Sequence, residues 1–448
     1  MKPIQNHGHS GSCLNGEPEF FNSELLGQFY SLTRHKSGLP IYVFPKKTAT
    51  VHALLATRFG SVDDRLGTGE TDKLPLGVAH FLEHKLFANP NGRDAFEDFA
   101  ALGADANAYT SHSSTVYLFS ATDRYEEALG VLLDFVGHPY FTKENVRKEQ
   151  GIIAEEIRMC RDNPYDRCYY GMLRGLYADH PIKEEICGSE DSILKITPEL
   201  LYRAYRTFYR PENMALVVVG DVERERVIAL ADRYLPKRPE SGPIRFFTHP
   251  EPPAVAQPFV KSYGQVAKPV FSIGIKNPPP ESDPQKRLLI DAGMAVLSEM
   301  LFSESGELYN ELLDSGMISP DFSSGFSQTR DFAFWQISGE ADDPEAVLSA
   351  ILSYLEKVKK NGLCAEDFER ARRVEYAEYI KSFDSAEEIA HMLLSFVLDS
   401  ARIFTYPEML KKLTLPFLSD LLSSRTDPGA FTLSAVYPNE KRKEALKE

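Results

Sequence analysis

The sequence predicts an α+β protein made of two domains of similar plan. The chain has 448 residues, which at about 150 residues per domain allows two or three domains, or two large ones. Strand-like and helix-like segments alternate along both halves, and their short connections favour α+β layers over a doubly wound sheet. Between the halves, residues 236–258 contain seven prolines. These three observations carry the fold prediction.

In the first half, we expect strands where short apolar runs occur and helices where apolar residues recur at a spacing of three and four. The expected strands are Ile41–Phe44, Val51–Phe59, Ser113–Ala121 and Met214–Val219. The expected helices are Ala79–Phe87, Asp94–Leu102, Tyr125–Val136 and Glu144–Arg161.

The second half shows the same alternation. The expected strands are Val270–Ile275 and Phe332–Gly339, and the expected helices are Gln285–Leu301, Pro344–Asn361, Ala365–Phe383 and Glu387–Leu398. Because proline cannot donate a backbone hydrogen bond, residues 236–258 are expected to form an extended linker. The predicted domains are therefore residues 1–235 and residues 259–448.

The amino-acid composition favours a globular protein and argues against a nucleic-acid or membrane partner. Hydrophobic residues make up 43% of the chain and aromatic residues 11%, which is ordinary for a globular protein. Fifty Lys and Arg against 65 Asp and Glu give a formal charge of −15, which argues against a nucleic-acid partner. No apolar run reaches the ~20 residues that span a bilayer, and the polar N-terminus lacks the features of a targeting signal. We therefore expect a cytoplasmic protein without a membrane partner.

One cluster of residues points to chemistry. In the run Gly77-Val78-Ala79-His80-Phe81-Leu82-Glu83-His84, the two histidines are four apart and share one face of a helix, with Glu83 close to that face. Two imidazoles and an adjacent carboxylate can supply two metal nitrogens and a base, as zinc-assisted hydrolysis requires. The alternative is a helix whose two histidines are merely exposed or hydrogen-bonded. The five cysteines form no C-x-x-C pair, so a cysteine-based zinc site is not indicated.

A third ligand is needed, because catalytic zinc usually has three protein ligands. On the helix that starts near Glu144, Glu149, Ile152, Ile153 and Glu156 follow one stripe. Carboxylates on an apolar stripe are costly unless they are paired or bound to a metal. Glu155 lies about 100° away from Glu156, at the edge of the stripe. A solvated acidic helix face is the simpler alternative, and the isoleucines argue against it.

These residues resemble the inverted-motif zinc peptidases, the family of pitrilysin, insulin-degrading enzyme and the mitochondrial processing peptidases. The likeness is closest to bacterial subunits similar to the processing peptidases. It rests on His80-x-x-Glu83-His84 followed by Glu149 and Glu156 seven apart. It extends through most of residues 30–235, and the second half matches only in outline. The matching segments are Gly38–Ile41, Gly60–Asp64, Asp105–Thr110, Phe208–Met214 and Val218–Asp221.

The resemblance implies a fold and a site. The fold would be two similar sandwich domains, each an antiparallel-rich sheet with helices on one side, arranged like a clam around a chamber. His80, His84 and Glu156 would bind one Zn²⁺ per chain, and Glu83 would be the general base that takes a proton from the attacking water. Glu149 would be a supporting carboxylate of the site.

The family also implies where substrate binds. Asn107, Ala108 and Tyr109 would lie on an edge strand to which a peptide adds as an extra strand through main-chain bonds. An ordinary strand end is the alternative for these three residues. The expected activity is a zinc-dependent endopeptidase that cuts peptides or unfolded leader segments. A catalytically silent peptide-binding or scaffold subunit of the same fold is the alternative.

One departure from the family concerns the second half. Self-sufficient members carry an Arg and a Tyr there, and the matching stretch Glu311–Pro320 has Leu312 or Leu313 and then Ser319 at those places. Neither Leu nor Ser can stabilise a developing oxyanion as the pair does. The chain is therefore expected to be the zinc-bearing half of a heterodimer whose homologous partner supplies the Arg and Tyr. Tyr309 or Arg330 from this chain is the alternative source.

Overall fold

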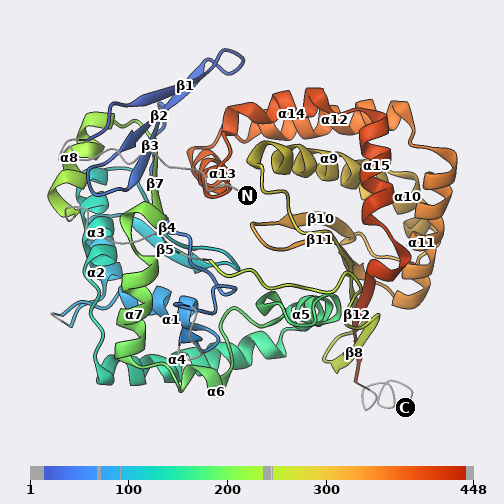
Figure 1. Ribbon diagram of the computed structural model, residues 1–448, viewed down its shortest axis with the longest axis horizontal. Helices are drawn as coiled ribbons and strands as arrows, with labels where there is room; N and C mark the ends of the chain where they lie inside the picture. Colours follow the sequence, from blue (N-terminus) through green and yellow to red (C-terminus); the bar gives the residue numbers. More distant parts are fainter. Residues whose placement is uncertain (1–14, 68–71, 91, 236–243, 245, 440–448) are drawn as a thin grey trace, which may run out of the picture.

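A computed structural model describes residues 15–67, 72–90, 92–235, 244 and 246–439. The chain forms two lobes, each built on one mixed sheet (Figure 1). Within the predicted linker, residues 236–243 and 245 lie outside the described residues. None of the helices in the described ranges is long and apolar enough to cross a membrane.

The N-terminal lobe contains a seven-stranded sheet in the order β1-β2-β3-β7-β4-β6-β5. Only β3 and β7 run parallel, and every other neighbouring pair is antiparallel. The strands are β1 (Glu19–Ser23), β2 (Gln28–Arg34), β3 (Pro40–Pro45), β4 (Val51–Thr57), β5 (Asp105–Thr110), β6 (Thr115–Ala121) and β7 (Met214–Gly220).

The C-terminal lobe contains a five-stranded sheet in the order β10-β11-β9-β12-β8. Here β8 and β12 are the parallel pair. The strands are β8 (Phe259–Gly264), β9 (Val270–Lys276), β10 (Ser323–Gln328), β11 (Ala333–Glu340) and β12 (Phe431–Pro438). Read from the open edge, β10-β11-β9-β12-β8 repeats the order β5-β6-β4-β7-β3 of the first sheet, with the parallel pair in the same place. The two lobes therefore share one plan, as the sequence predicts.

The helices also occur in the same order in both lobes. Those of the N-terminal half are α1 (Val78–Leu86), α2 (Ala95–Ala101), α3 (Tyr125–Gly137), α4 (Lys143–Asp162), α5 (Pro164–Leu176), α6 (Glu190–Ile193), α7 (Pro198–Phe208) and α8 (Arg224–Tyr234). Those of the C-terminal half are α9 (Pro284–Phe302), α10 (Glu307–Asp314), α11 (Pro344–Asn361), α12 (Ala365–Lys381), α13 (Ala386–Leu398), α14 (Tyr406–Lys412) and α15 (Leu415–Arg425). In chain order, α1 corresponds to α9, α4 to α12 and α5 to α13.

The two halves exchange one helix each. Helix α5 comes from the first half but packs against β9 and β12 of the second sheet. Helix α13 comes from the second half but packs against β4 and β7 of the first sheet, where Leu393 and Leu394 belong to the buried cluster of Leu54 and Val217. The two sheets are thus tied together by packed helices as well as by the linker. Periodicity did not predict this exchange, because it shows which face of a helix is apolar but not which sheet that face covers.

Candidate metal centre and peptide-binding edge

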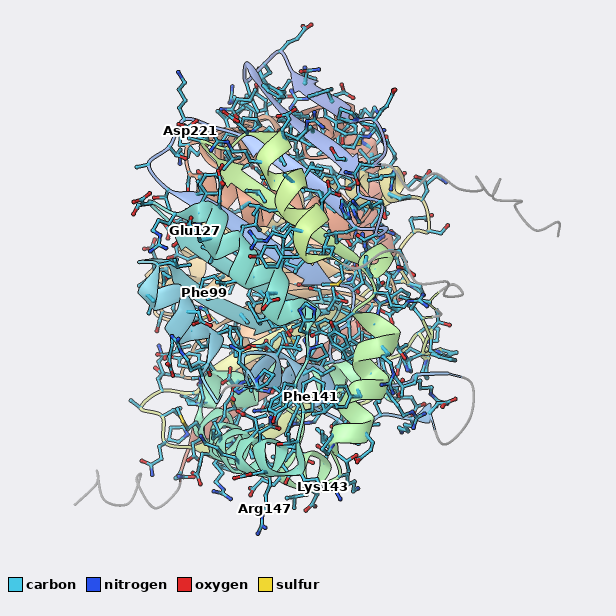
Figure 2. The ribbon with its side chains drawn as sticks, turned by 90° about the vertical axis from the view of Figure 1, so that its left-hand side faces the viewer. Phe99, Glu127, Phe141, Lys143, Arg147 and Asp221 are labelled. Atoms are coloured by element: carbon cyan, nitrogen blue, oxygen red, sulfur yellow. The ribbon has the colours of Figure 1, made fainter. Side chains whose placement is uncertain are left out.

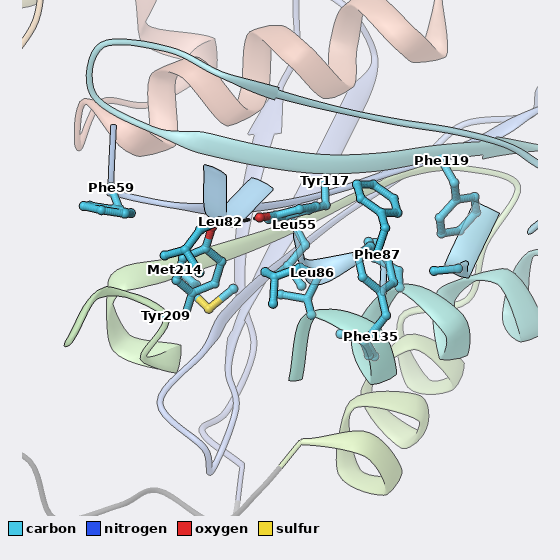
Figure 3. Close-up of a cluster of buried hydrophobic side chains, with 14 of the residues drawn as sticks. Leu55, Phe59, Leu82, Leu86, Phe87, Tyr117, Phe119, Phe135, Tyr209 and Met214 are labelled. Atoms are coloured by element: carbon cyan, nitrogen blue, oxygen red, sulfur yellow. Dashed lines mark hydrogen bonds between the residues drawn. The ribbon is translucent and has the colours of Figure 1, made fainter. Parts of the chain in front are cut away.

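Helix α1 positions the two histidines because its opposite face is anchored in the core. It starts after Gly77, whose φ of 87° and close approach to the Cys187 carbonyl both require glycine. Leu82 and Leu86 point into the apolar cluster beneath the sheet (Figure 3). Residues two apart on a helix face nearly opposite ways, so burying Leu82 turns His80 and His84 toward helix α4.

Helix α4 brings the carboxylates. Its N-cap Thr142 and Asn145 form a capping box, and its first turns, with Lys143 and Arg147, lie on the outside of the lobe (Figure 2). Farther along, Glu149 is buried and Glu156 faces the histidines.

The neighbours of Glu156 on α4 lie as follows. Glu155 points outward and pairs with Arg158, and its side chain is 71% exposed. The prediction that both isoleucines lie on a buried stripe is wrong for Ile152, which is 48% exposed and lines a cavity, whereas Ile153 is buried.

His80, His84 and Glu156 bring three possible ligand atoms within 4.8 Å of one another. The Nε2 of His80 lies 3.3 Å from Glu156 Oε1, and the Nε2 of His84 lies 3.6 Å from Glu156 Oε2. Tetrahedral zinc with bonds of about 2.0–2.1 Å separates its ligand atoms by roughly 3.3 Å. Two nitrogens and a carboxylate at these separations fit Zn²⁺, so the donor set suits the metal that the sequence motif implies.

Glu149 contacts the candidate ligand His84 on the ring nitrogen that does not face Glu156. The Nδ1 of His84 donates to Glu149 Oε1 at 3.1 Å, and Lys85 Nζ donates to Glu149 Oε2 at 3.1 Å. Burial alone would raise the pKa of Glu149, but these hydrogen bonds outweigh it and lower that pKa. Burial would lower the pKa of His84, but its bond to Glu149 and the nearby carboxylates raise it. The hydrogen bond with His80 lowers the pKa of Glu156, so both glutamates favour the ionised form.

Glu83 is held by the sheet. The hydroxyl of Thr110, the last residue of β5, donates to Glu83 Oε2 at 2.5 Å. Glu83 is 8% exposed and lines the same cavity as the metal-ligand atoms. Because one carboxylate oxygen accepts from Thr110, the other remains available to accept a proton beside the metal centre.

Strand β5 borders that cavity with an open edge. Within the part of the chain that the structure describes, it is the last strand of its sheet and pairs only with β6. Asn107, Ala108 and Tyr109 all line the cavity, which has a volume of about 1070 Å³ and includes Ile152 in its wall. Tyr109 is 40% exposed, and its ring stacks on that of His391 of α13, with 6.1 Å between ring centroids. The structure thus brings these three residues next to the metal centre, with a helix of the other half nearby.

A second cluster, His180, His249 and Asp331, joins the two halves. The Nδ1 of His180 accepts the backbone N–H of Ile182 at 3.1 Å, so the ring proton lies on Nε2, which is 3.5 Å from Asp331 Oδ2. A protonated Nε2 cannot coordinate a metal. The Nε2 of His249 lies 3.0 Å from Asp64 Oδ1. We therefore interpret this cluster as a set of polar contacts that connects the two halves of the chain.

Known proteins resemble the chain in both halves. Residues 60–189 match the family described as Insulinase (Peptidase family M16), and residues 195–375 match the Peptidase M16 inactive domain. The chain is 36% identical over 408 residues to the uncharacterized zinc protease YmfH of Bacillus subtilis, covering 90% of this chain and 95% of that protein. The chain belongs to the M16 peptidase family. It is also 24% identical over 379 residues to the zinc protease PqqE of Helicobacter pylori, with 82% of each chain covered.

A solved M16 structure has the same architecture. The M16-like peptidase from Alicyclobacillus acidocaldarius superposes with a TM-score of 0.87 at 31% identity, covering 92% of this chain and 99% of that one. Membership in the M16 family and the two-domain fold, both expected from the sequence, are confirmed.

The sequence analysis predicts no functional role for Thr110 or Lys85, which contact Glu83 and Glu149 of the candidate site. Thr110 falls only within the matching segment Asp105–Thr110. For Lys85 a signal exists, because a lysine between His84 and Leu86-Phe87 on an apolar helix indicates a buried cation that needs a partner.

Proposed function

We propose that the chain is a zinc-dependent endopeptidase. The observation that carries this proposal is the convergence of His80, His84 and Glu156 beside Glu83, at the open edge of β5. When bound, Zn²⁺ supplies a Lewis acid that polarises the scissile carbonyl and lowers the pKa of water. His80, His84 and Glu156 hold the ion.

Glu83 acts as the general base. Its free carboxylate oxygen accepts the proton of the attacking water and returns a proton to the leaving amine. The hydrogen bond from Thr110 fixes the orientation of this carboxylate. Because Glu83 is nearly buried, its electrostatic interactions are stronger than they would be in water.

The substrate is a peptide held as an extra β-strand along β5. The open edge offers main-chain donors and acceptors, and residues 107–109 face a cavity large enough for an extended segment. This kind of binding uses main-chain hydrogen bonds, so the substrate must offer an extended segment that is not already paired. Unfolded or flexible chains offer such a segment, whereas a folded substrate does not. Peptides and leader segments are therefore the proposed substrate class.

A homologous subunit completes the oxyanion site. Leu312 is buried in the core of the C-terminal lobe, and the Ser319 hydroxyl accepts from Lys268 at 3.2 Å. The alternatives from within the chain are engaged elsewhere. The hydroxyl of buried Tyr309 donates to the Pro320 carbonyl, and Arg330 pairs with Asp63. These contacts support a heterodimer in which the partner supplies the Arg and Tyr.

The test combines metal content with cleavage. The purified chain should take up one equivalent of zinc, and His80→Ala should lose it. A mixed peptide pool should be cut when a homologous subunit carrying the Arg and Tyr is added, and Glu83→Gln should stay silent in the same mixture. Full activity of the isolated chain would defeat the heterodimer. Zinc uptake without cleavage in any mixture would favour the silent peptide-binding subunit instead.

A further inference from the structure

Lys85 is a buried cation next to the metal centre. Its side chain is 6% exposed, although it directly follows His84 on α1. Lysine is almost never buried without a partner. The partner is Glu149, whose Oε2 accepts from Lys85 Nζ at 3.1 Å. The carboxylate of Glu149 therefore gives the buried ammonium group a partner of opposite charge.

Glu149 stands between this lysine and a metal ligand. One of its oxygens accepts from Lys85 and the other accepts from His84 Nδ1. The chain Lys85–Glu149–His84 therefore fixes the position of the carboxylate at both oxygens. With the proton held on Nδ1, His84 presents the lone pair of Nε2 toward Glu156, which is the form that binds a metal.

The other histidine has no such support. The Nδ1 of His80 is buried and has no hydrogen-bond partner among the described residues. Ring orientation within the metal centre is thus fixed by hydrogen bonding at His84. The centre also gathers the carboxylates of Glu83, Glu149 and Glu156 around one cavity. A buried positive charge beside Glu149 offsets their mutual repulsion.

We propose that Lys85 is a positioning residue for the metal centre. It acts through Glu149: it anchors that carboxylate, which in turn orients His84 for Zn²⁺. This inference rests on the proposed function, since it concerns the same zinc. Loss of an outer partner of a metal ligand typically weakens metal binding about 10–100-fold.

The experiment measures zinc affinity by competition with a chromophoric chelator. Lys85→Met, similar in length and apolar, should bind zinc about 10–100-fold more weakly than the wild type. Lys85→Gln keeps a donor without the charge and should fall in between. The matched control is Lys148→Met, because Lys148 lines the same cavity but is exposed. It should bind zinc like the wild type.

A double-mutant cycle tests the route through Glu149. In a Glu149→Gln background, Lys85→Met should cost little further affinity, because the anchored carboxylate is already gone. Equal losses in both backgrounds would overturn the inference, as would wild-type affinity in Lys85→Met. If Lys85→Met does not fold, the same cycle is run with Lys85→Gln. A wild-type chain that binds no zinc would overturn the proposed function itself, so the two failures are distinguishable.

Discussion

The two halves of the molecule follow one plan, yet the candidate metal ligands His80, His84 and Glu156 all lie in the first half. In the N-terminal lobe, α1 and α4 face each other through His80, His84, Glu149 and Glu156. In the C-terminal lobe, the corresponding α9 and α12 are joined by an ion pair between Glu299 and Arg370, with 3.0 Å between Oε1 and Nη1. The same backbone arrangement thus supports a candidate metal centre in one lobe and an ordinary ion pair in the other. Function lies in the side chains placed on the fold, not in the fold.

The sharpest way to test this contrast is to remove one carboxylate from each lobe. Glu83→Gln should lower peptide hydrolysis by about 10²–10⁴-fold while zinc stays bound, because it removes the base but no ligand. Glu299→Gln on α9 should leave hydrolysis unchanged. Steady-state rates and zinc content measured on both variants check the pair. Near-normal turnover in Glu83→Gln would remove Glu83 from its role.

Two neighbouring glutamates on α4 allow a test within one lobe. Glu156→Gln should weaken zinc binding by more than the 10–100-fold that an outer partner typically costs, since it removes a direct ligand. Glu155→Gln should bind zinc normally, because that side chain points outward to Arg158. Zinc competition titrations decide between them. Loss of zinc in Glu155→Gln alone would show that the wrong neighbour has been assigned.

The contact between the lobes should respond to acid. His112 lies 3.1 Å from Ser61 Oγ and packs edge-on against Phe332 of the other half. Burial lowers its pKa from 6.5 to about 4, with His180 adding to the effect. Between these two values the unfolded chain binds a proton that the folded chain does not. The stability from neutral His112 is therefore complete above pH 6.5 and is lost as the pH falls toward 4.

The contribution of His112 to this loss is about 2 kcal/mol in the free energy of unfolding between pH 7 and pH 5. It is measured as a difference: urea unfolding of the wild type and of His112→Asn at both pH values, with the change between pH 7 and pH 5 compared. That change should differ by about 2 kcal/mol between the wild type and His112→Asn, whereas His138→Asn, at an exposed site, should match the wild type. An unchanged pH dependence in His112→Asn would show that this histidine is not the group responsible.

The packing of the exchanged helix α5 on the second sheet can be tested by substituting one of its glycines. On α5, a Cβ at Gly175 would collide with the Thr432 side chain of β12. Gly175→Val should therefore destabilise the protein by about 1–3 kcal/mol through overpacking. Gly151→Val on α4 is the matched control, because a Cβ there meets nothing within 4 Å. Denaturant midpoints compare the two, and equal midpoints would mean that α5 does not pack tightly on the second sheet.

The sequence predicted much of this molecule and missed particular parts of it. The spacing of His80, Glu83 and His84 predicted which face of α1 they share, because helical geometry is local. The apolar runs predicted six of the twelve strands in the described residues for the same reason, and they missed β1, β2, β5, β8, β10 and β12. The exchange of α5 and α13 was not predicted, since it depends on contacts between segments far apart in the sequence, such as α13 and β4. Ile152 was misplaced because it lies beside the cavity, where the stripe of α4 meets an opening and not the core. The helix pattern around Lys85 indicates a buried cation, but it does not identify the partner, because Glu149 lies 64 residues away in the sequence.

The smallest predicted effect concerns a hydrogen bond that both lobes share, and it distinguishes a structural role of this bond from a catalytic one. In both lobes the last residue of the open-edge strand donates a hydrogen bond to a carboxylate on the corresponding helix. Thr110 of β5 donates to Glu83 on α1 at 2.5 Å, and Gln328 of β10 donates to Asp291 on α9 at 2.6 Å. If the contact serves only to fasten the strand end to the helix, losing it should cost stability alike in both lobes.

If the Thr110–Glu83 hydrogen bond also orients the general base, its removal should lower the rate of catalysis, whereas removal of the Gln328–Asp291 hydrogen bond should lower only stability. Thr110→Val keeps the shape of the side chain and removes the hydroxyl. It should lower kcat about ten-fold, the equivalent of ~1.4 kcal/mol and near the lower end for a hydrogen bond to a charged group. KM and zinc content should stay unchanged, and Thr110→Ser should restore kcat. Gln328→Met should leave kcat unchanged and lower only the denaturant midpoint. A normal kcat in Thr110→Val would show that this hydrogen bond has only a structural role. Thr110 would then hold Glu83 in the same way as Gln328 holds Asp291, without affecting catalysis.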